Sequence, residues 1–297
     1  MIIPDPGTPE TVADGIRRVL APNPGPMTHW GTNTWIVGEG RVAVIDPGPA
    51  DEAHLSDLKR ALRGEIVTQI LVTHPHADHS PLAPILSRDT GAPILGFGRY
   101  DAGRSEVMRE LALSAEVGGG EGRDQSFMPD ERVSEGDLIT GDHWTIEVLH
   151  TPGHFAGHLS FRLGDTVFSG DHVMDWASTL VSPPDGDVAD FISTSERLAQ
   201  LGLEVCHTGH GRSISDPSDR LMDLVDHRRG RETAILAALS AKGATIHQIT
   251  ARVYSDTPAS LIPAAHRNVL AHLIDLEKRN LVRAHPSIGL QSTYALV

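Results

Sequence analysis

The segment THPHADHS, residues 73 to 80, places three histidines and one aspartate within six consecutive positions: His74, His76, Asp78 and His79. Imidazole and carboxylate groups are ligands with which proteins bind divalent first-row metals. In an extended loop, His74 and His76 can both reach one ion, whereas a helix would need ligands four residues apart. Asp78 and His79 continue the turn and can face a second ion. We therefore interpret the segment as a metal-binding loop.

Three later segments have the same design, in which an apolar strand ends in histidine or aspartate beside glycine. TIEVLHTPGHFAGH supplies His154, TVFSGDH supplies Asp171 and LEVCHTGHG supplies His210. Glycine lets the backbone turn sharply and approach other groups closely. Because every segment delivers a polar side chain at a strand end, we expect the four segments to form one site at one edge of a sheet sandwich.

Four further histidines lie close to these candidate ligands, and we interpret them as structural: His150, His158, His172 and His207. Of the four, His158 is the best candidate for holding a ligand or its proton in position. Thr73 and Ser80 flank the cluster, but no histidine–carboxylate pair remains free of the metals to activate a hydroxyl group. The sequence therefore predicts no side-chain nucleophile.

The elements that position these residues form a mixed pattern. We expect strands over 32–37, 42–46, 66–73, 92–97, 158–163 and 165–169, strands RVSEGDLI and WTIEVL within 132–149, and helices over 51–63 and about 80–90. Strands and helices do not alternate strictly, which predicts an α/β (α+β) fold of two packed sheets with helices outside. Residues 97–130 break the pattern with glycine-rich runs around a helical piece, SEVMRELALSAE. We interpret them as an insertion or lid.

The composition changes after residue 218. A helical stretch over 219–240, the helical runs TIHQITARVY and PAAHRNVLAHLIDLEKRNLV, and a terminal hairpin pattern follow one another. This is the layout of a winged-helix module, so we divide the chain into a catalytic domain, 1–218, and a tail domain, 219–297. The first holds 15 Lys and Arg against 32 Asp and Glu, and the second holds 10 against 7. A basic tail on an acidic body favours an anionic partner on the tail side.

The composition also indicates where the protein acts. Apolar residues make up 39% of the 297, enough for a large core, and no apolar stretch is long enough for a membrane helix. The start, MIIPDPGTPETVADG, has neither the basic nor the apolar region of a secretory signal. The single Cys206 excludes an intramolecular disulfide. We expect a cytoplasmic protein with no membrane partner.

The motifs VIDPG, THPHADH, TPGHFAGH, SGD and GHG occur in this order over residues 44–211. Together they resemble the metallo-β-lactamase fold superfamily. The resemblance implies an αβ/βα sandwich with two metals at its edge. It implies His74, His76 and His154 as ligands of the first metal, Asp78, His79 and His210 as ligands of the second, and Asp171 as the bridge.

Within that superfamily, the chain is most similar to a branch with a C-terminal winged helix, which includes endoribonucleases. SPPDGD (182–187) and residues 255–282 carry this resemblance. The glyoxalase II and phosphodiesterase branches have a bridging aspartate like Asp171, which true β-lactamases lack, so lactam hydrolysis is disfavoured. His76 stands where the diiron oxygen-reducing branch has an acidic residue. Persulfide dioxygenases share the first-metal triad, which leaves a mononuclear iron enzyme open.

The implied centre has the chemistry of a hydrolase. Two metal ions about 3.5 Å apart would lower the pKa of a bound water toward about 7 and polarise a carbonyl or phosphoryl oxygen. We expect metal-bound hydroxide to be the nucleophile, and Asp78 to be a catalytic residue that both binds metal and orients the nucleophile. The ligand set suits two divalent ions, zinc best, with manganese or iron as alternatives.

Three functions remain open at this point. We rank first the hydrolysis of a small-molecule ester, thioester or lactone. An endoribonuclease ranks second, favoured by the basic tail. A non-enzymatic, nucleic-acid-binding regulator ranks third, because an intact ligand set argues against it. Aromatic residues make up only 4% of the chain and suggest no stacking platform for single strands, so RNA ranks below a small molecule as partner. The winged helix would then pack on the body or mediate a homodimer, and the insertion and the tail would form the substrate pocket.

Overall fold

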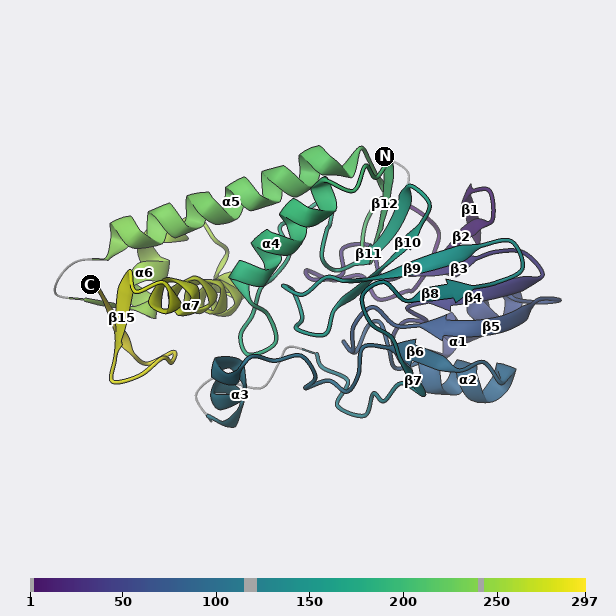
Figure 1. Ribbon diagram of the computed structural model, residues 1–297, viewed down its shortest axis with the longest axis horizontal. Coiled ribbons are helices and arrows are strands. Elements are labelled where there is room, and N and C mark those ends of the chain that lie inside the picture. The colour runs from purple at the N-terminus through teal and green to yellow at the C-terminus, as the bar shows by residue number, and fades with distance from the viewer. Residues whose placement is uncertain (1–2, 115–121, 240–242) are drawn as a thin grey trace.

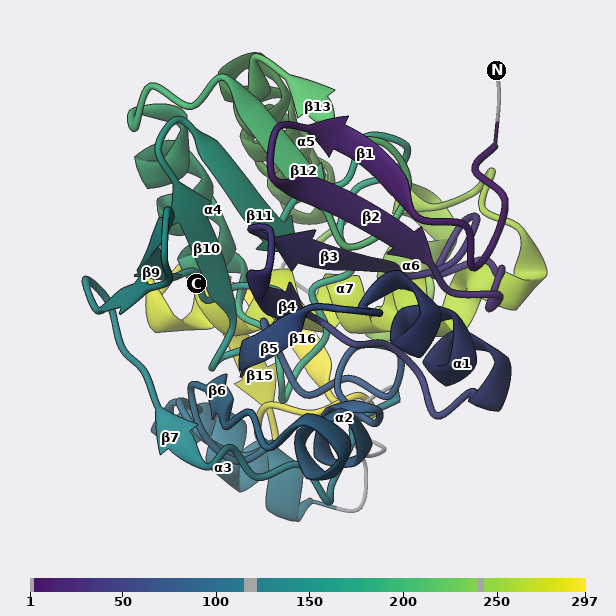
Figure 2. The same cartoon turned by 90° about the vertical axis from the view of Figure 1, so that its right-hand side faces the viewer.

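The computed structural model describes residues 3–114, 122–239 and 243–297. Two β-sheets pack face to face, with helices on both outer faces (Figures 1 and 2). In the described ranges, the strands of the first sheet lie side by side in chain order: β1 (Glu10–Ala13), β2 (Ile16–Leu20), β3 (Asn33–Val37), β4 (Arg41–Ile45), β5 (Ile66–Leu71), β6 (Ile94–Gly96) and β7 (Glu131–Arg132). Pairing is antiparallel from β1 to β4 and parallel from β4 to β7.

The second sheet is mostly antiparallel. Its strands are β8 (Leu138–Thr140), β9 (Thr145–His150), β10 (Leu159–Leu163), β11 (Thr166–Gly170), β12 (Val205–Thr208) and β13 (Ile214–Ser215), and they lie in the order β13-β12-β11-β10-β9-β8. Only β11 and β12 of these described strands pair parallel, because α4 (Val188–Ala199) connects them as a crossover.

Alternating side chains divide each sheet into an inner and an outer face. Trp35 and Leu71 of the first sheet meet Phe161 and Phe168 of the second in one buried cluster between the sheets. The outer face of the first sheet packs on α1 (Glu52–Ala61) and α2 (Ala83–Thr90). The outer face of the second packs on α4 and on the first half of α5 (Pro217–Ala238). The expected αβ/βα sandwich is therefore confirmed.

Most expected elements are present, and one is wrong. RVSEGDLI is not one strand, because a turn separates β7, which ends at Arg132, from β8, which begins at Leu138. Gly136 has a φ of 83°, and the Asp137 carboxylate accepts a hydrogen bond from the backbone N–H of Ser134 at 2.8 Å. Helix α4 is an element that the sequence pattern did not predict. The Asp187 carboxylate caps it by accepting hydrogen bonds from the N–H groups of Ala189 and Asp190.

The insertion contains α3 (Glu106–Leu113), as the helical piece predicted, while its glycine-rich run lies partly outside the described residues. Met108 and Leu111 of α3 pack in the buried core of the tail. The insertion therefore contacts the tail as well as the body, and Figure 1 shows α3 below α7.

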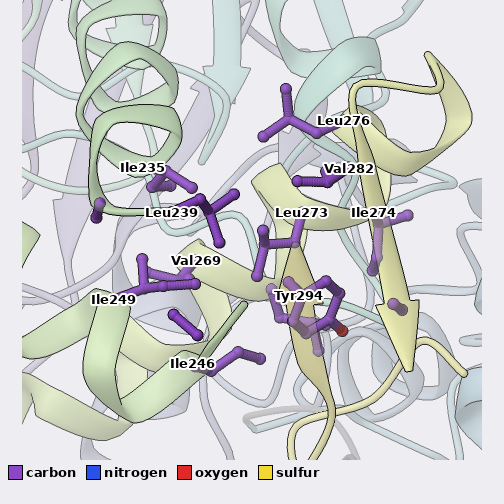
Figure 3. Packing of buried hydrophobic residues seen from close by; sticks show 14 of the residues in the cluster. Ile235, Leu239, Ile246, Ile249, Val269, Leu273, Ile274, Leu276, Val282 and Tyr294 are labelled. Atoms are coloured by element: carbon purple, nitrogen blue, oxygen red, sulfur yellow. The ribbon is translucent and has the colours of Figure 1, made fainter. Parts of the chain in front are cut away.

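The tail has the expected winged-helix layout. After α5 come β14 (Ala244–Thr245), α6 (Ile246–Val253), the short 3₁₀ turn η1 (Ala259–Leu261), α7 (Ile262–Lys278), β15 (Val282–His285) and β16 (Thr293–Leu296). Leu273 of α7 and Tyr294 of β16 lie at the centre of its core (Figure 3). The Tyr294 hydroxyl donates a hydrogen bond to the carbonyl oxygen of Gly289 at 2.9 Å, which holds the loop between β15 and β16 against β16.

Helix α5 belongs to two cores at once. Leu221 and Leu224, near its start, pack on the second sheet, whereas Ile235, near its end, packs in the tail core. The helix begins at Pro217, two residues before the expected start of the tail. The division into 1–218 and 219–297 stays a prediction, because one continuous helix joins the two parts. No helix in the described ranges is long and apolar enough to cross a membrane.

Candidate metal centre

All the candidate ligands lie in loops at one end of the sandwich. The loop between β5 and α2 carries His74 to His79, and His154 follows β9. Asp171 follows β11, and His210 follows β12. The strands β9, β11 and β12 run in the same direction, so their carboxyl ends meet at the same edge. The structure therefore brings together every residue that the sequence analysis proposed as a metal ligand.

Three imidazoles form the first donor group. His76 Nδ1 lies 2.9 Å from His74 Nε2 and 3.2 Å from His154 Nε2. Together with a carboxylate oxygen of Asp171, these nitrogen atoms lie within 4.8 Å of one another. Three converging imidazoles and one carboxylate are a donor set that a divalent first-row metal accepts.

The second donor group contains Asp78, His79 and His210. The Asp78 Oδ2 atom lies 3.2 Å from His210 Nε2 and 3.6 Å from His79 Nε2. The side chain of Asp78 is 26% exposed, whereas both imidazoles are buried. Asp78 is therefore the member of this group that faces solvent.

Asp171 lies between the two groups. Its Oδ1 atom is 3.4 Å from His79 Nε2, and its Oδ2 atom is 3.3 Å from His210 Nε2 and 3.8 Å from His154 Nε2. A single carboxylate thus contacts imidazoles of both groups, which is the position that a bridging ligand needs.

Hydrogen bonds behind the imidazoles orient their nitrogen atoms. The Nδ1 atom of His154 lies 2.7 Å from the carbonyl oxygen of Leu180, and that of His210 lies 3.1 Å from the carbonyl oxygen of Gly31. A carbonyl oxygen can only accept, so both Nδ1 atoms carry the proton. Nε2 is therefore the atom of each ring that faces the centre and serves as the metal ligand once it carries no proton.

Asp46 orients two parts of the metal-binding loop, a role that the sequence analysis did not assign. Its carboxylate accepts hydrogen bonds from the backbone N–H of Thr73 at 2.8 Å and from the Thr73 hydroxyl at 2.7 Å. It also lies 2.9 Å from His79 Nδ1. With its proton directed to Asp46, the Thr73 oxygen can accept from His74 Nδ1, 3.0 Å away. The motif VIDPG contained the signal, but nothing in the sequence showed which side chains Asp46 contacts.

His158 lies directly behind Asp171. Its Nε2 atom accepts a hydrogen bond from the backbone N–H of Asp171 at 3.3 Å, and its Nδ1 atom lies 2.8 Å from the Thr151 hydroxyl. The other three histidines interpreted as structural form hydrogen bonds away from the donor groups: His150 with the carbonyl oxygen of Ala156, His172 with Ser195 and His207 with Ser213.

The donor atoms fit metal ions. Two of them, His79 Nε2 and Asp171 Oδ1, are buried and have no hydrogen-bond partner among the described residues, although buried polar atoms are normally satisfied. Burial lowers the pKa of His76 to about 3, with the neighbouring His154 adding to the effect. The imidazole of His76 is therefore neutral and available as a ligand at neutral pH.

In the second group the pKa values of the imidazoles are raised, whereas that of His76 in the first group is lowered. Burial opposes the positive charge of His210, but the carboxylates of Asp171 and Asp78 outweigh it and raise its pKa to about 10. The same balance raises the pKa of His79. In the absence of a cation, the two imidazoles therefore keep their protons as ion pairs with the carboxylates. A divalent cation would take the place of those protons.

A cavity of about 370 Å³ opens over both donor groups. Met27, Met174 and Leu180 form an apolar wall, and Gly122 comes from the insertion. On one side the cavity meets Asp185, whose buried carboxylate forms ion pairs with two arginines of the insertion: Arg104 at 2.5 Å and Arg123 at 3.3 Å. The described lining of this cavity comes from the body and the insertion, whereas the tail lines a second cavity beside it.

Comparison with known proteins gives the family. The metallo-beta-lactamase superfamily model matches residues 27–210, and the beta-lactamase associated winged helix domain matches residues 245–289. A beta-lactamase-like protein 2 homolog of Drosophila melanogaster is 28% identical over 289 residues, covering 93% of this chain and 92% of that protein. An Aspergillus fumigatus protein named atrochrysone carboxyl ACP thioesterase is 26% identical, covering 80% of this chain and 69% of that protein.

A solved structure resembles the whole chain. A metallo-beta-lactamase family protein from Thermus thermophilus aligns with a TM-score of 0.77 at 25% identity. The alignment covers 97% of this chain and all of that one, so it includes the tail as well as the sandwich. By its motif order, its fold and its family match, the chain belongs to the metallo-beta-lactamase superfamily and carries the winged-helix domain associated with it.

Proposed function

We propose that this protein is a two-metal hydrolase that cleaves an ester, thioester or lactone bond in a small molecule. The observation that carries the proposal is the position of Asp171, whose carboxylate contacts imidazoles of both donor groups. The cavity above the two groups, with its apolar wall, supports a substrate with an acyl part.

Each donor group would hold one of two divalent ions. His74, His76 and His154 would hold the first ion, whereas Asp78, His79 and His210 would hold the second, with Asp171 shared between them. When bound, the ions supply Lewis acidity, which activates water and polarises a carbonyl oxygen. Zinc fits this imidazole-rich set best, with manganese or iron as alternatives.

The chain's own residues would position the reactants. Asp78 faces the cavity, so its carboxylate can accept a hydrogen bond from water there and direct a lone pair toward the substrate. The wall of Met27, Met174 and Leu180 would exclude bulk water from the acyl part. Asp46 and His158 would keep the ligands in place from behind, through Thr73, His79 and the backbone of Asp171.

A substrate screen of the metal-loaded protein tests this proposal. We expect turnover of at least one of three acyl substrates, namely an activated thioester, an aryl ester and a lactone, and loss of that turnover after chelation of the metals. Thioesters rank first, because a relative that is similar over most of its length is named as a thioesterase. Turnover of none of the three, in a preparation shown to hold metal, would contradict the proposal.

An endoribonuclease is the second candidate, favoured by the basic tail on an acidic body. The tail holds 10 Lys and Arg against 7 Asp and Glu, whereas residues 1–218 hold 15 against 32. Because the body repels phosphate, we expect any binding of labelled single-stranded RNA by the full chain to be weak and to fall steeply between low and moderate salt. A fluorescence titration measures this. No detectable binding at low salt would remove the ribonuclease hypothesis.

A further inference from the structure

A second cavity, of about 280 Å³, lies beside the cavity over the donor groups. Met27, Met174 and Leu180 line both cavities, so the two spaces meet at these apolar side chains. The far wall comes from α5 and from the rest of the tail, including Tyr254 and Asn268. A ligand that lies over the donor groups can therefore extend toward the tail.

Arg228, on the wall of this second cavity, is a buried cation. Its side chain is 2% exposed, and its guanidinium donates hydrogen bonds to the carbonyl oxygen of Thr179 and, at 3.0 Å, to Asn268 Oδ1. Its Nε atom has no hydrogen-bond partner within residues 3–114, 122–239 and 243–297. In the described part of the chain, no carboxylate forms an ion pair with Arg228. Burial of a guanidinium without a counter-charge is costly, and it lowers the pKa of Arg228 to about 10.

Arg231 lies three residues further along the same face of α5 and lines the same cavity. Its guanidinium donates to the carbonyl oxygen of Val253 at 2.9 Å and lies 4.4 Å from the centre of the Tyr254 ring. It also has no carboxylate partner among the described residues. None of the described residues that line this cavity is acidic, although the net charge of the chain is −14.

This arrangement matches a doubly charged oxyanion. A phosphate monoester carries a charge of about −1.5 to −2 at neutral pH, which offsets two guanidinium groups, whereas a carboxylate offsets one. The planar N–H groups of arginine also fit the oxygen atoms of a phosphate. A phosphate here would compensate the buried charge of Arg228.

We propose that the second cavity is a subsite for a phosphate monoester on the thiol arm of an acyl thioester, whose acyl end lies over the donor groups. Arg231 and Arg228 bind the phosphate, and the apolar side chains shared by the two cavities contact the arm between. The proposal rests on the proposed function and narrows it to thioesters with a phosphorylated arm.

Two substrates that differ by one group test the subsite. They are the acetyl thioester of pantetheine and the same thioester of pantetheine 4′-phosphate, both given to the metal-loaded full chain. We expect KM to be about tenfold or more lower for the phosphorylated substrate, with similar kcat, because charge-assisted hydrogen bonds act on binding. In Arg231→Gln this KM ratio should fall toward one, because the KM of the phosphorylated substrate rises when one of the two guanidinium groups is removed.

Two further variants separate binding from folding. Arg229→Gln alters the neighbouring residue, which is exposed and pairs with Glu196, so it should keep the wild-type ratio. Arg228→Lys keeps the buried charge but loses the planar N–H groups, and should give an intermediate ratio. An equal KM ratio in the wild type and in Arg231→Gln would overturn the subsite, as would a wild type that does not prefer the phosphorylated substrate.

Calorimetry with pantetheine 4′-phosphate and pantetheine on the same proteins gives a readout that needs no turnover. If neither thioester is hydrolysed but the phosphate still binds through Arg231, the proposed function fails while the anion subsite stands. If a short 5′-phosphorylated RNA binds in an Arg231-dependent manner and pantetheine 4′-phosphate does not, the thioester assignment is overturned in favour of nucleic acid.

Discussion

Replacing Asp171 with alanine is expected to lower kcat/KM by a factor of about 10³ or more, the largest effect of any single substitution in the site. Its carboxylate contacts imidazoles of both donor groups, at 3.4 Å from His79 and 3.3 Å from His210. Its removal takes a shared anionic ligand from two cations that repel each other. We therefore expect the loss of one or both ions together with the loss of activity.

Metal analysis after gentle purification checks this expectation. The wild type should hold about two ions per chain, and Asp171→Ala one or none. The control is Asp165→Ala, in the turn at the opposite end of β11, where the side chain is exposed and remote from the donor groups. A single ion that remains tightly bound in both the wild type and Asp171→Ala would contradict the two-metal centre and favour a mononuclear enzyme.

The convergence of the candidate ligands could be predicted from the sequence, because each of them stands in a local sequence motif. The loop from His74 to His79 has a spacing that no packing role requires, and the other ligands follow apolar strands whose length and alternation are visible in the sequence. Strand ends of a sandwich meet at one edge, so the convergence of the four segments also followed. The sandwich itself could be predicted for the same reason.

The contacts behind the ligands could not be predicted, because they join segments distant in the chain. Asp46 and Thr73 are separated by 27 residues, and His210 and Gly31 by 179. In each case the sequence does not show which distant group the residue contacts. From the sequence we expect RVSEGDLI to be one strand, whereas the Ser134–Asp137 turn within it depends on one hydrogen bond and on the φ of Gly136.

The contacts between the tail and the body could not be predicted from the sequence either. Its helices and hairpin follow from periodicity, but the use of α5 by two cores does not, because a helical pattern does not show which of its residues pack on the body and which in the tail core. Arg228 and Arg231 appear in the sequence as part of a solvated basic run, DHRRGRE. Only the packing of α5 against the body shows that Arg228 is buried beside a cavity whose described lining holds no carboxylate.

Replacing Asp78 with asparagine is expected to lower kcat by about 10²-fold with little change in KM, the second-largest effect in the site. Asparagine keeps the shape of the side chain but removes its charge, and its NH₂ group cannot accept a hydrogen bond. Among the donors of the second group, Asp78 is the one that faces the cavity, with 26% of its side chain exposed. The substitution therefore affects the orientation of water more than the binding of substrate.

Steady-state kinetics with the best substrate from the screen, measured on metal-saturated protein, separates the two possible causes of the loss. If kcat falls while the metal content stays near that of the wild type, Asp78 acts on the nucleophile. If kcat recovers in excess metal, Asp78 acts mainly as a ligand, because the second ion is then retained only by mass action. The control is Asp89→Asn on the exposed side of α2, where the carboxylate pairs with Lys59 and should not affect either quantity. Near-normal turnover of Asp78→Asn with both ions bound would show that the negative charge at this position is dispensable, and the role assigned to Asp78 would be wrong.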